Sequence, residues 1–167
     1  MDFDKDLAAR QEARTLCRAA REAQKKLARF PQEKLDAISY TLKPGDIVFV
    51  HTSASAAWGS PKYLTTGCGF GRAATLWLIE QGVHLVGTDA WSWDAPLGSI
   101  AENFRKTGDR SLIWEGHKAG AEKAYCQIEK LCNLESLPPY GFRVSAFPVK
   151  IERASAGWAR VVAMMEE

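Results

Sequence analysis

The sequence has no run of eighteen or more apolar residues, so it lacks the kind of helix that spans a bilayer. Its first residues, MDFDKDL, are charged and contain no apolar stretch of the kind that a secretory signal needs. From these two absences we expect a soluble, cytoplasmic protein with no membrane partner.

Cysteine is scarce and unpaired in sequence. The four cysteines form no C-x-x-C pair, and in a reducing compartment we expect them to be free thiols rather than a disulfide framework. Neither acidic nor basic residues predominate strongly, because the two kinds are interspersed and the formal net charge is +2. Proteins that bind nucleic acid usually present a strongly basic face, so we expect no nucleic-acid partner.

Several catalytic motifs are absent. There is no G-x-S-x-G elbow, and no cysteine lies in a catalytic signature, which argues against a serine or cysteine nucleophile. The glycine-rich segment 67–72 (GCGFGR) has arginine where a dinucleotide fingerprint needs its third glycine. We therefore interpret these glycines as shaping the start of a helix. The three histidines show no H-x-x-x-H or H-x-H spacing, so no local pair is arranged to chelate a metal.

What the chain does contain indicates one domain that carries a helical arm. Its 167 residues include 46% apolar and 25% charged residues, which is enough for a real core. Residues 4–30 have neither glycine nor proline, and their apolar residues recur at steps of three and four, which predicts a long amphipathic helix. We assign residues 1–30 to this arm and residues 31–167 to the domain. Because its seam is mostly alanine, the arm needs a partner surface.

After a short helix that starts at Pro31, β-rich runs alternate with helical patterns. A strand at 47–51, a helix at 72–81 and a strand at 84–88 predict a parallel crossover. The fold class is α/β, a mixed β-sheet with flanking helices. The further strands that we predict lie at residues 125–131, 143–151 and 158–164.

Glu129 is an isolated carboxylate in a predicted strand and is a candidate site residue. Glu129 ends a predicted strand between apolar residues, and His117 lies just before that strand. A buried ionised carboxylate is costly unless it is paired or binds a metal, so a metal site and a pairing with Lys130 or Arg143 both remain open. By contrast, we interpret His51 and His84, each at a strand end, as hydrogen-bonded structural residues.

Four segments follow one another along the chain, namely KPGDIV (43–48), LVGTDAWSWD (85–94), EKLCNL (129–134) and SAFPVKI (145–151). In this order they resemble the cyclase family, which contains bacterial kynurenine formamidases. The resemblance runs from Pro44 to the C-terminus. Residues 43–48 (KPGDIV) are similar to the family's P-G-D-I-V turn, and residues 85–94 (LVGTDAWSWD) are similar to its G-x-D-x-x-S-x-D segment. His117 precedes residues 129–134 (EKLCNL) as a histidine precedes the family's E-x-L-x-N-L pattern, and residues 145–151 (SAFPVKI) resemble its A-L-P-L-K-I strand.

The resemblance implies a swivelling β/β/α-like fold and a metal-dependent hydrolase of amide or formamide C–N bonds, arylformamidase-like, acting on a small aromatic or cyclic amide. Glu129 would bridge divalent metal, with zinc expected first and manganese as the alternative. His117 would be a metal ligand or the general acid/base beside the metal. Trp91 and Trp93 would suit an aromatic substrate wall, although tryptophans are more often core or interface residues.

One part of the family pattern is missing. Its main metal motif, H-x-G-T-H-x-D, lies upstream of the P-G-D-I-V turn, yet residues 1–43 contain no histidine. Three explanations remain open: a truncated or split gene product, a subunit whose partner supplies the missing ligands, or a domain that kept the fold and lost the chemistry. We carry two hypotheses, an incomplete hydrolase and a non-catalytic oligomerisation or binding domain. Both predict association, as a homo-oligomer or with a complementary chain.

Overall fold

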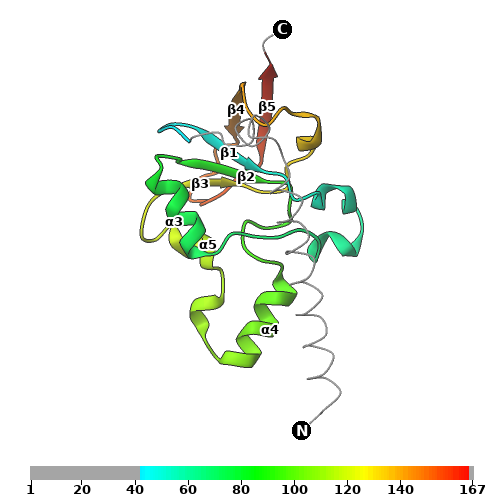
Figure 1. Ribbon diagram of the computed structural model, residues 1–167, viewed down its shortest axis with the longest axis vertical. Coiled ribbons are helices and arrows are strands. Elements are labelled where there is room, and N and C mark those ends of the chain that lie inside the picture. The colour runs from blue at the N-terminus through cyan, green and yellow to red at the C-terminus, as the bar shows by residue number, and fades with distance from the viewer. Residues whose placement is uncertain (1–41, 166–167) are drawn as a thin grey trace, which may run out of the picture. The chain divides into compact units, whose positions relative to one another are not determined.

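The computed structural model describes residues 42–165, which Figure 1 draws in colour. The helical arm predicted for residues 1–30 and the short helix predicted after Pro31 lie outside the described residues.

Three parallel strands form the sheet that carries the site. They are β1 (Ile47–Val50), β2 (Leu85–Thr88) and β3 (Cys126–Ile128), in the order β1-β2-β3. Val48 lies opposite Val86, and Val86 lies opposite Gln127. The helix α3 (Arg72–Glu80) connects β1 to β2, which confirms the predicted parallel crossover.

The main core lies where α3 packs on this sheet. Leu78, Val83, Val86 and Trp93 form one buried cluster, and each is at most 4% exposed. Full burial of an aliphatic side chain of this size contributes about 1.5–3 kcal/mol. The short helix α5 (Glu115–Ala119) lies beside α3 in Figure 1. This packing fixes α5, which carries His117, against α3.

Two α-helices were not predicted from the sequence. The helix α4 (Leu97–Thr107) ends at Gly108, whose φ of 68° is the left-handed conformation that suits a helix C-terminus. Its apolar residues Leu97, Ile100 and Phe104 follow the three-and-four spacing of an amphipathic helix, a signal that is present but short. With five residues, α5 is too short for any periodicity to show. Within residues 42–165, four further helical turns are present, namely η1 (Ala54–Ala57), η2 (Pro61–Leu64), η3 (Arg110–Leu112) and η4 (Leu134–Ser136).

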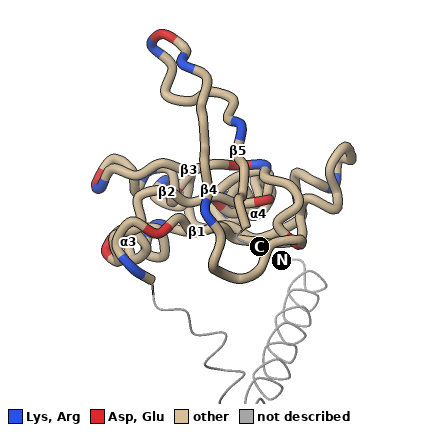
Figure 2. Tube along the Cα trace, turned by 90° about the horizontal axis from the view of Figure 1, so that it is seen from above, with Lys and Arg blue, Asp and Glu red and all other residues tan. Residues whose placement is uncertain are grey.

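Two further strands form a separate antiparallel ribbon. β4 (Phe142–Pro148) and β5 (Ala159–Met165) pair along seven positions, from Phe142 opposite Met165 to Pro148 opposite Ala159. A hydrogen bond of 2.8 Å from Val149 N to Trp158 O extends this pairing into the connection, which projects away from the other described elements in Figure 2. Parallel and antiparallel pairing thus occur in different sheets, within the α/β class that the sequence predicts.

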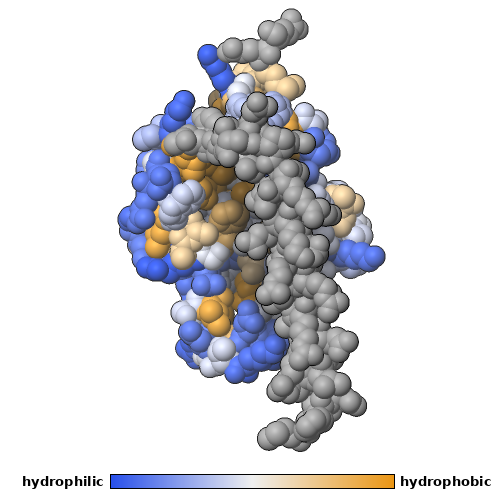
Figure 3. All heavy atoms as spheres, viewed as in Figure 1, coloured by the Kyte–Doolittle hydropathy of each residue, from blue (hydrophilic) through white to orange (hydrophobic). Residues whose placement is uncertain are grey.

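The ribbon exposes much apolar side-chain surface. Trp158 is 81% exposed, Phe147 68% and Met165 61%. Figure 3 shows apolar residues reaching the surface on the face in view, with hydrophilic residues at its margins.

Between residues 42 and 165, no helix has the length and apolar character needed to cross a membrane.

Candidate functional site

Polar side chains gather where the three parallel strands end. Asp89 directly follows β2, and its carboxylate accepts hydrogen bonds from the loop after β1. Thr52 donates its backbone N–H and its hydroxyl to Oδ1, both at 2.7 Å, and Ser55 donates the same two groups to Oδ2, both at 3.2 Å. The carboxyl ends of parallel strands meet at one edge of a sheet, which is where sites form in open α/β folds.

Asp89 is fully buried but well stabilised as an anion. Burial alone would raise the pKa of its carboxyl group, but the hydrogen bonds from Thr52 and Ser55 outweigh burial and lower it. His51 lies at the rim of this cluster, with Nε2 3.9 Å from Asp89 Oδ2. Tyr63 donates its hydroxyl to the Asp89 carbonyl at 2.8 Å, and its pKa is raised, first by burial and then by the nearby Asp89 charge. This arrangement is a rigid support for the segment that follows Asp89.

Glu129 follows β3, and its two carboxylate oxygens have different partners. Oε1 accepts a hydrogen bond of 2.8 Å from Trp93 N and one of 3.2 Å from the Ser92 hydroxyl. Oε2 lies 3.1 Å from Lys130 Nζ. The pairing with Lys130 that the sequence left open is therefore present. The carboxylate is also held in place by the segment after β2.

His117 lies beside Glu129 and is oriented by Asp94. The Asp94 side chain is 3% exposed and accepts hydrogen bonds from Gly116 N at 2.6 Å and His117 N at 3.3 Å, at the start of α5. It also pairs with His117 Nδ1. A carboxylate at this position places the proton of a neutral imidazole on Nδ1 and leaves Nε2 as the hydrogen-bond acceptor.

The second ring nitrogen of His117 points to the end of β3. His117 Nε2 lies 2.6 Å from the Gln127 side-chain nitrogen and 3.6 Å from Glu129 Oε1. The Trp114 ring meets the imidazole edge-on, with 4.6 Å between ring centroids. The structure therefore brings together the two residues, His117 and Glu129, that the sequence singled out as a pair.

Backbone strain accompanies both residues. Trp114, just before α5, has a φ of 59°, and Lys130, just after Glu129, has a φ of 62°. Non-glycine residues adopt this left-handed conformation at a cost of about 1–3 kcal/mol, and such residues concentrate at functional sites. At Lys130 the conformation is stabilised by its backbone N–H, which donates to the Ala90 carbonyl at 3.1 Å.

Tyr125 contacts the two neighbours of the His117 side chain, the backbone of Gly116 and the side chain of Gln127. Its hydroxyl lies 2.7 Å from the Gly116 carbonyl and 2.8 Å from Gln127 Oε1. Its pKa is raised well above the ordinary value, chiefly by burial and then by the charges of Asp94 and Glu129, so the hydroxyl stays protonated. Gln127 is thereby held between the phenol and the imidazole.

The two tryptophans predicted as a substrate wall have different surroundings. Trp93 is 1% exposed, stacks on Phe70 with 4.4 Å between ring centroids, and donates Nε1–H to the Thr75 hydroxyl at 3.0 Å. It is a core residue, which was the alternative interpretation. Trp91 is half-buried, and Lys130 Nζ lies 4.8 Å from its ring centroid. Trp91 is the more exposed of the two rings, and its substrate role stays a prediction.

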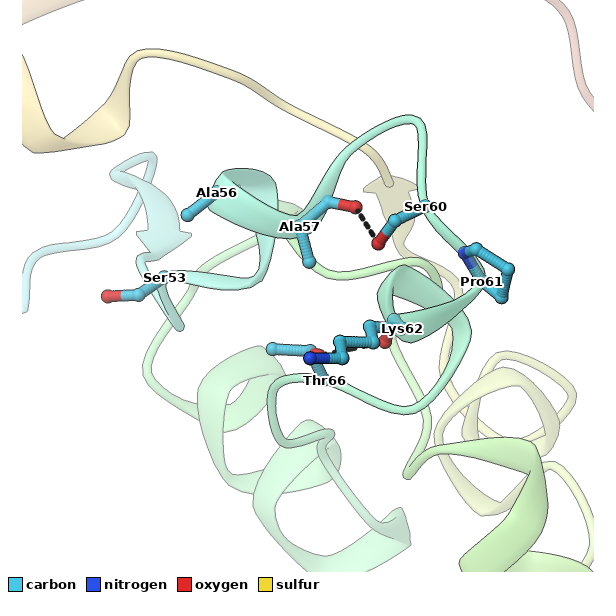
Figure 4. Close-up of a pocket in the computed structure, with 7 residues that line it drawn as sticks. All are labelled: Ser53, Ala56, Ala57, Ser60, Pro61, Lys62 and Thr66. Atoms are coloured by element: carbon cyan, nitrogen blue, oxygen red, sulfur yellow. Dashed lines mark hydrogen bonds between the residues drawn. The ribbon is translucent and has the colours of Figure 1, made fainter.

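A broad hollow lies next to this site without including it. Its volume is about 720 Å³, and Figure 4 shows the residues that line it between η1 and η2, namely Ser53, Ala56, Ala57, Ser60, Pro61, Lys62 and Thr66. A second, narrow hollow shares Thr66 with it and is lined by Trp91, Ser92 and Asp94 among others. Neither hollow is lined by His117 or Glu129.

The predicted metal ligands can be tested against this geometry. His117 Nε2 and Glu129 Oε1 face each other at 3.6 Å, but Nε2 already contacts the Gln127 amide. Within residues 42–165, no group of three or more histidine, cysteine, aspartate or glutamate side chains could hold a metal ion. A zinc site needs at least three protein ligands, so the described residues alone do not fit a metal.

Asp94, Gln127 and Lys130 contribute to the site, although none was singled out as a site residue. Asp94 ends the segment 85–94 that carried the family resemblance, so the motif contained this signal. Gln127 lies two positions before Glu129, and strand alternation points two such residues to the same face. Lys130 was considered as the partner of Glu129, but its place over Trp91 depends on its unusual backbone conformation.

Comparisons with known proteins identify the family of the chain and proteins that share its fold. A family model described as "Putative cyclase" matches residues 12–95, about half of the sequence. The chain belongs to the cyclase family. The match begins upstream of Pro44, in a part of the chain where we found no family motif, and it ends just after Asp94. No curated protein matches the chain.

Two solved structures share the fold. An isatin hydrolase bound to the product analogue thioisatinate has 20% sequence identity and a TM-score of 0.60. Isatin hydrolase A from Ralstonia solanacearum has 27% identity and a TM-score of 0.58. Each likeness covers 75% of this chain and 47% of the other protein. The chain thus spans about half the length of these proteins, which confirms the predicted partial domain.

Proposed function

We propose that this chain forms part of a hydrolase of amide-type C–N bonds, with His117 as the general acid/base. The observation that carries the proposal is the chain of contacts from buried Asp94 through His117 to Glu129 in a member of the cyclase family. Isatin hydrolases share the fold, and isatin is a cyclic aromatic amide, so small aromatic or cyclic amides, including formamides of the arylformamidase type, are the proposed substrate class.

The contacts define what each side chain can do. With its proton on Nδ1, a neutral His117 can accept the proton of an attacking water at Nε2 and deliver it to the leaving nitrogen as the C–N bond breaks. Asp94 fixes the tautomer and stabilises the imidazolium that forms in between. The Gln127 amide occupies Nε2 in the structure, so substrate or water has to displace it.

The activity requires more than the described residues. Divalent metal, zinc or alternatively manganese, is part of the proposal, but its remaining ligands have to come from outside residues 42–165. We infer that a complementary polypeptide carrying H-x-G-T-H-x-D supplies them. An upstream reading frame that encodes this motif would support such a partner.

A second candidate function follows from the same shortage of ligands. A cyclase domain without a metal site can serve as a non-catalytic oligomerisation or binding domain, in which His117 and Glu129 are relics. In the part of the chain that the structure describes, every buried side-chain polar atom has a hydrogen-bond partner, so the fold needs no metal to satisfy these groups.

Metal content and hydrolysis distinguish the two functions. Metal is measured by elemental analysis and zinc calorimetry on the native chain and on Glu129→Ala, and hydrolysis is measured with isatin and formanilide in the presence of Zn²⁺ or Mn²⁺. If the hydrolase is complete, Glu129→Ala loses metal and His117→Ala loses about 10²–10⁴-fold in rate. His84→Ala, an exposed histidine outside the site, is the matched control. Absence of metal and turnover in the isolated chain, with no difference among these proteins, means that the chain lacks the metal chemistry by itself, and the same measurements are then repeated with the complementary polypeptide. Absence of both in that mixture favours the binding domain.

A further inference from the structure

The ribbon of β4 and β5 points to an interaction surface that does not depend on the proposed hydrolase activity. One edge of β5 pairs with β4, and no other described strand joins this sheet. A two-stranded ribbon is marginally stable alone in water, and a free edge offers unpaired backbone groups to another strand. β5 has one charged residue, Arg160, and no proline to block such pairing. β4, in contrast, ends in Pro148, which cannot donate to a ladder.

We propose that β5 pairs in antiparallel fashion with β5 of a second copy of this chain, about a twofold axis at Val162. In that register Val162 lies opposite the partner's Val162. Arg160 lies opposite the partner's Met164, and Val161 opposite the partner's Ala163. Like charges are kept apart, and β-branched and aliphatic side chains meet across the axis, which is favourable between neighbouring strands.

The exposed side chains of β5 support a second copy as the occupant. Val162 is 44% exposed and Met164 is 46% exposed, and both lie on the same face of the strand as Arg160. Pairing about Val162 places each of these apolar side chains next to an apolar side chain or the aliphatic stem of Arg160 of the partner. The strand is thus complementary to itself in its apolar pattern, and its one charged residue, Arg160, does not face a like charge. Two ribbons then form one four-stranded sheet, a size at which antiparallel sheets are stable.

Light scattering with size-exclusion chromatography at micromolar concentration tests this dimer. We expect the native chain to be dimeric and Val162→Lys to be monomeric, because the substitution places two lysines face to face at the axis. Val149→Lys makes the same change at a valine that is 55% exposed and lies past the end of β4, and it should stay dimeric. A monomeric native chain overturns the proposal.

A cysteine pair tests the register even if Val162→Lys fails to fold. Directly opposite residues of antiparallel strands have Cα atoms about 4.5–5.5 Å apart, within the range that a disulfide spans. Oxidation of Val162→Cys by oxygen with copper phenanthroline should therefore join two copies through residue 162, as shown by mass spectrometry of the linked peptide. Met164→Cys, opposite the partner's Arg160, should not form the equivalent link. Equal linking of both variants, or none through residue 162, overturns the proposed register.

Discussion

The surroundings of His117 and the β4–β5 ribbon differ in which side chains they bury and which they expose. Around His117, carboxylates are buried among donors. Asp89 accepts hydrogen bonds from the loop after β1, and Asp94 accepts hydrogen bonds from the start of α5. In the ribbon, apolar side chains such as Trp158 and Phe147 are exposed to water. Proteins normally bury apolar side chains and expose charged ones. The buried carboxylates of the first region therefore need hydrogen-bond partners within the chain, and the exposed apolar side chains of the second need another surface to cover them.

The difference indicates which region can stand alone. Within residues 42–165, no buried side-chain polar atom lacks a hydrogen-bond partner, so the site region is complete as a structure although its metal ligands are too few. The two strands of the ribbon pair along their full length, but many of their apolar side chains are not buried. Substitutions should therefore be costly in the first region and nearly neutral for the stability of a single copy in the second.

Gly69→Ala should have the largest effect. A Cβ at Gly69 would lie 2.0 Å from the backbone carbon of Asp94, and the backbone cannot yield without moving the residue that orients His117. We expect a loss of about 3 kcal/mol or more in the free energy of unfolding, measured by urea denaturation. Gly98→Ala is the matched control, since nothing lies within 4 Å of its added methyl group on α4. Equal stability of the two variants would contradict the close packing of segment 69–71 on Asp94.

Asp94→Ala should be next in size. The substitution leaves Gly116 N and His117 N without their buried acceptor and removes the partner of His117 Nδ1. We expect a loss of about 2–4 kcal/mol in the free energy of unfolding. Glu122→Ala, which breaks the exposed ion pair with Arg72, should cost far less in the same urea measurement. A similar loss in both variants would show that Asp94 is not a buried anchor of α5.

Asp89→Asn should cost less and should depend on pH. At neutral pH the amide cannot accept all the hydrogen bonds from Thr52 and Ser55, and we expect a loss of about 1–3 kcal/mol. The pKa of Asp89 is lower in the folded than in the unfolded chain, so its carboxylate stabilises the fold above the unfolded value of about 4. This contribution disappears as the pH falls through the folded pKa. The gap between wild type and variant in urea midpoints should therefore narrow from pH 7 toward pH 3, and a constant gap would contradict the assignment.

Much of the parallel sheet could be predicted because its residues form short, distinct patterns. The buried runs of β1 and β2, with the helix α3 between them, were visible in the sequence. His117 and Glu129 were found through family spacing, and the structure places His117 Nε2 3.6 Å from Glu129 Oε1, while their roles stay predictions. The helix α5 could not be predicted, because it is a single turn fixed by tertiary hydrogen bonds to Asp94. The core position of Trp93 likewise depends on Phe70 and Thr75, which are distant in the sequence.

The smallest effect is expected in the ribbon. Trp158 is 81% exposed, so Trp158→Ser removes little buried surface from a single copy, and we expect the free energy of unfolding to change by less than about 0.5 kcal/mol. The measurement is urea denaturation at a concentration where light scattering shows the monomer. Leu78→Ala, at a site 4% exposed, serves as the opposite case and should cost about 2–5 kcal/mol. A large loss for Trp158→Ser would mean that another surface covers this ring even in the monomer, and the contrast between a self-contained site region and an uncovered ribbon would no longer hold.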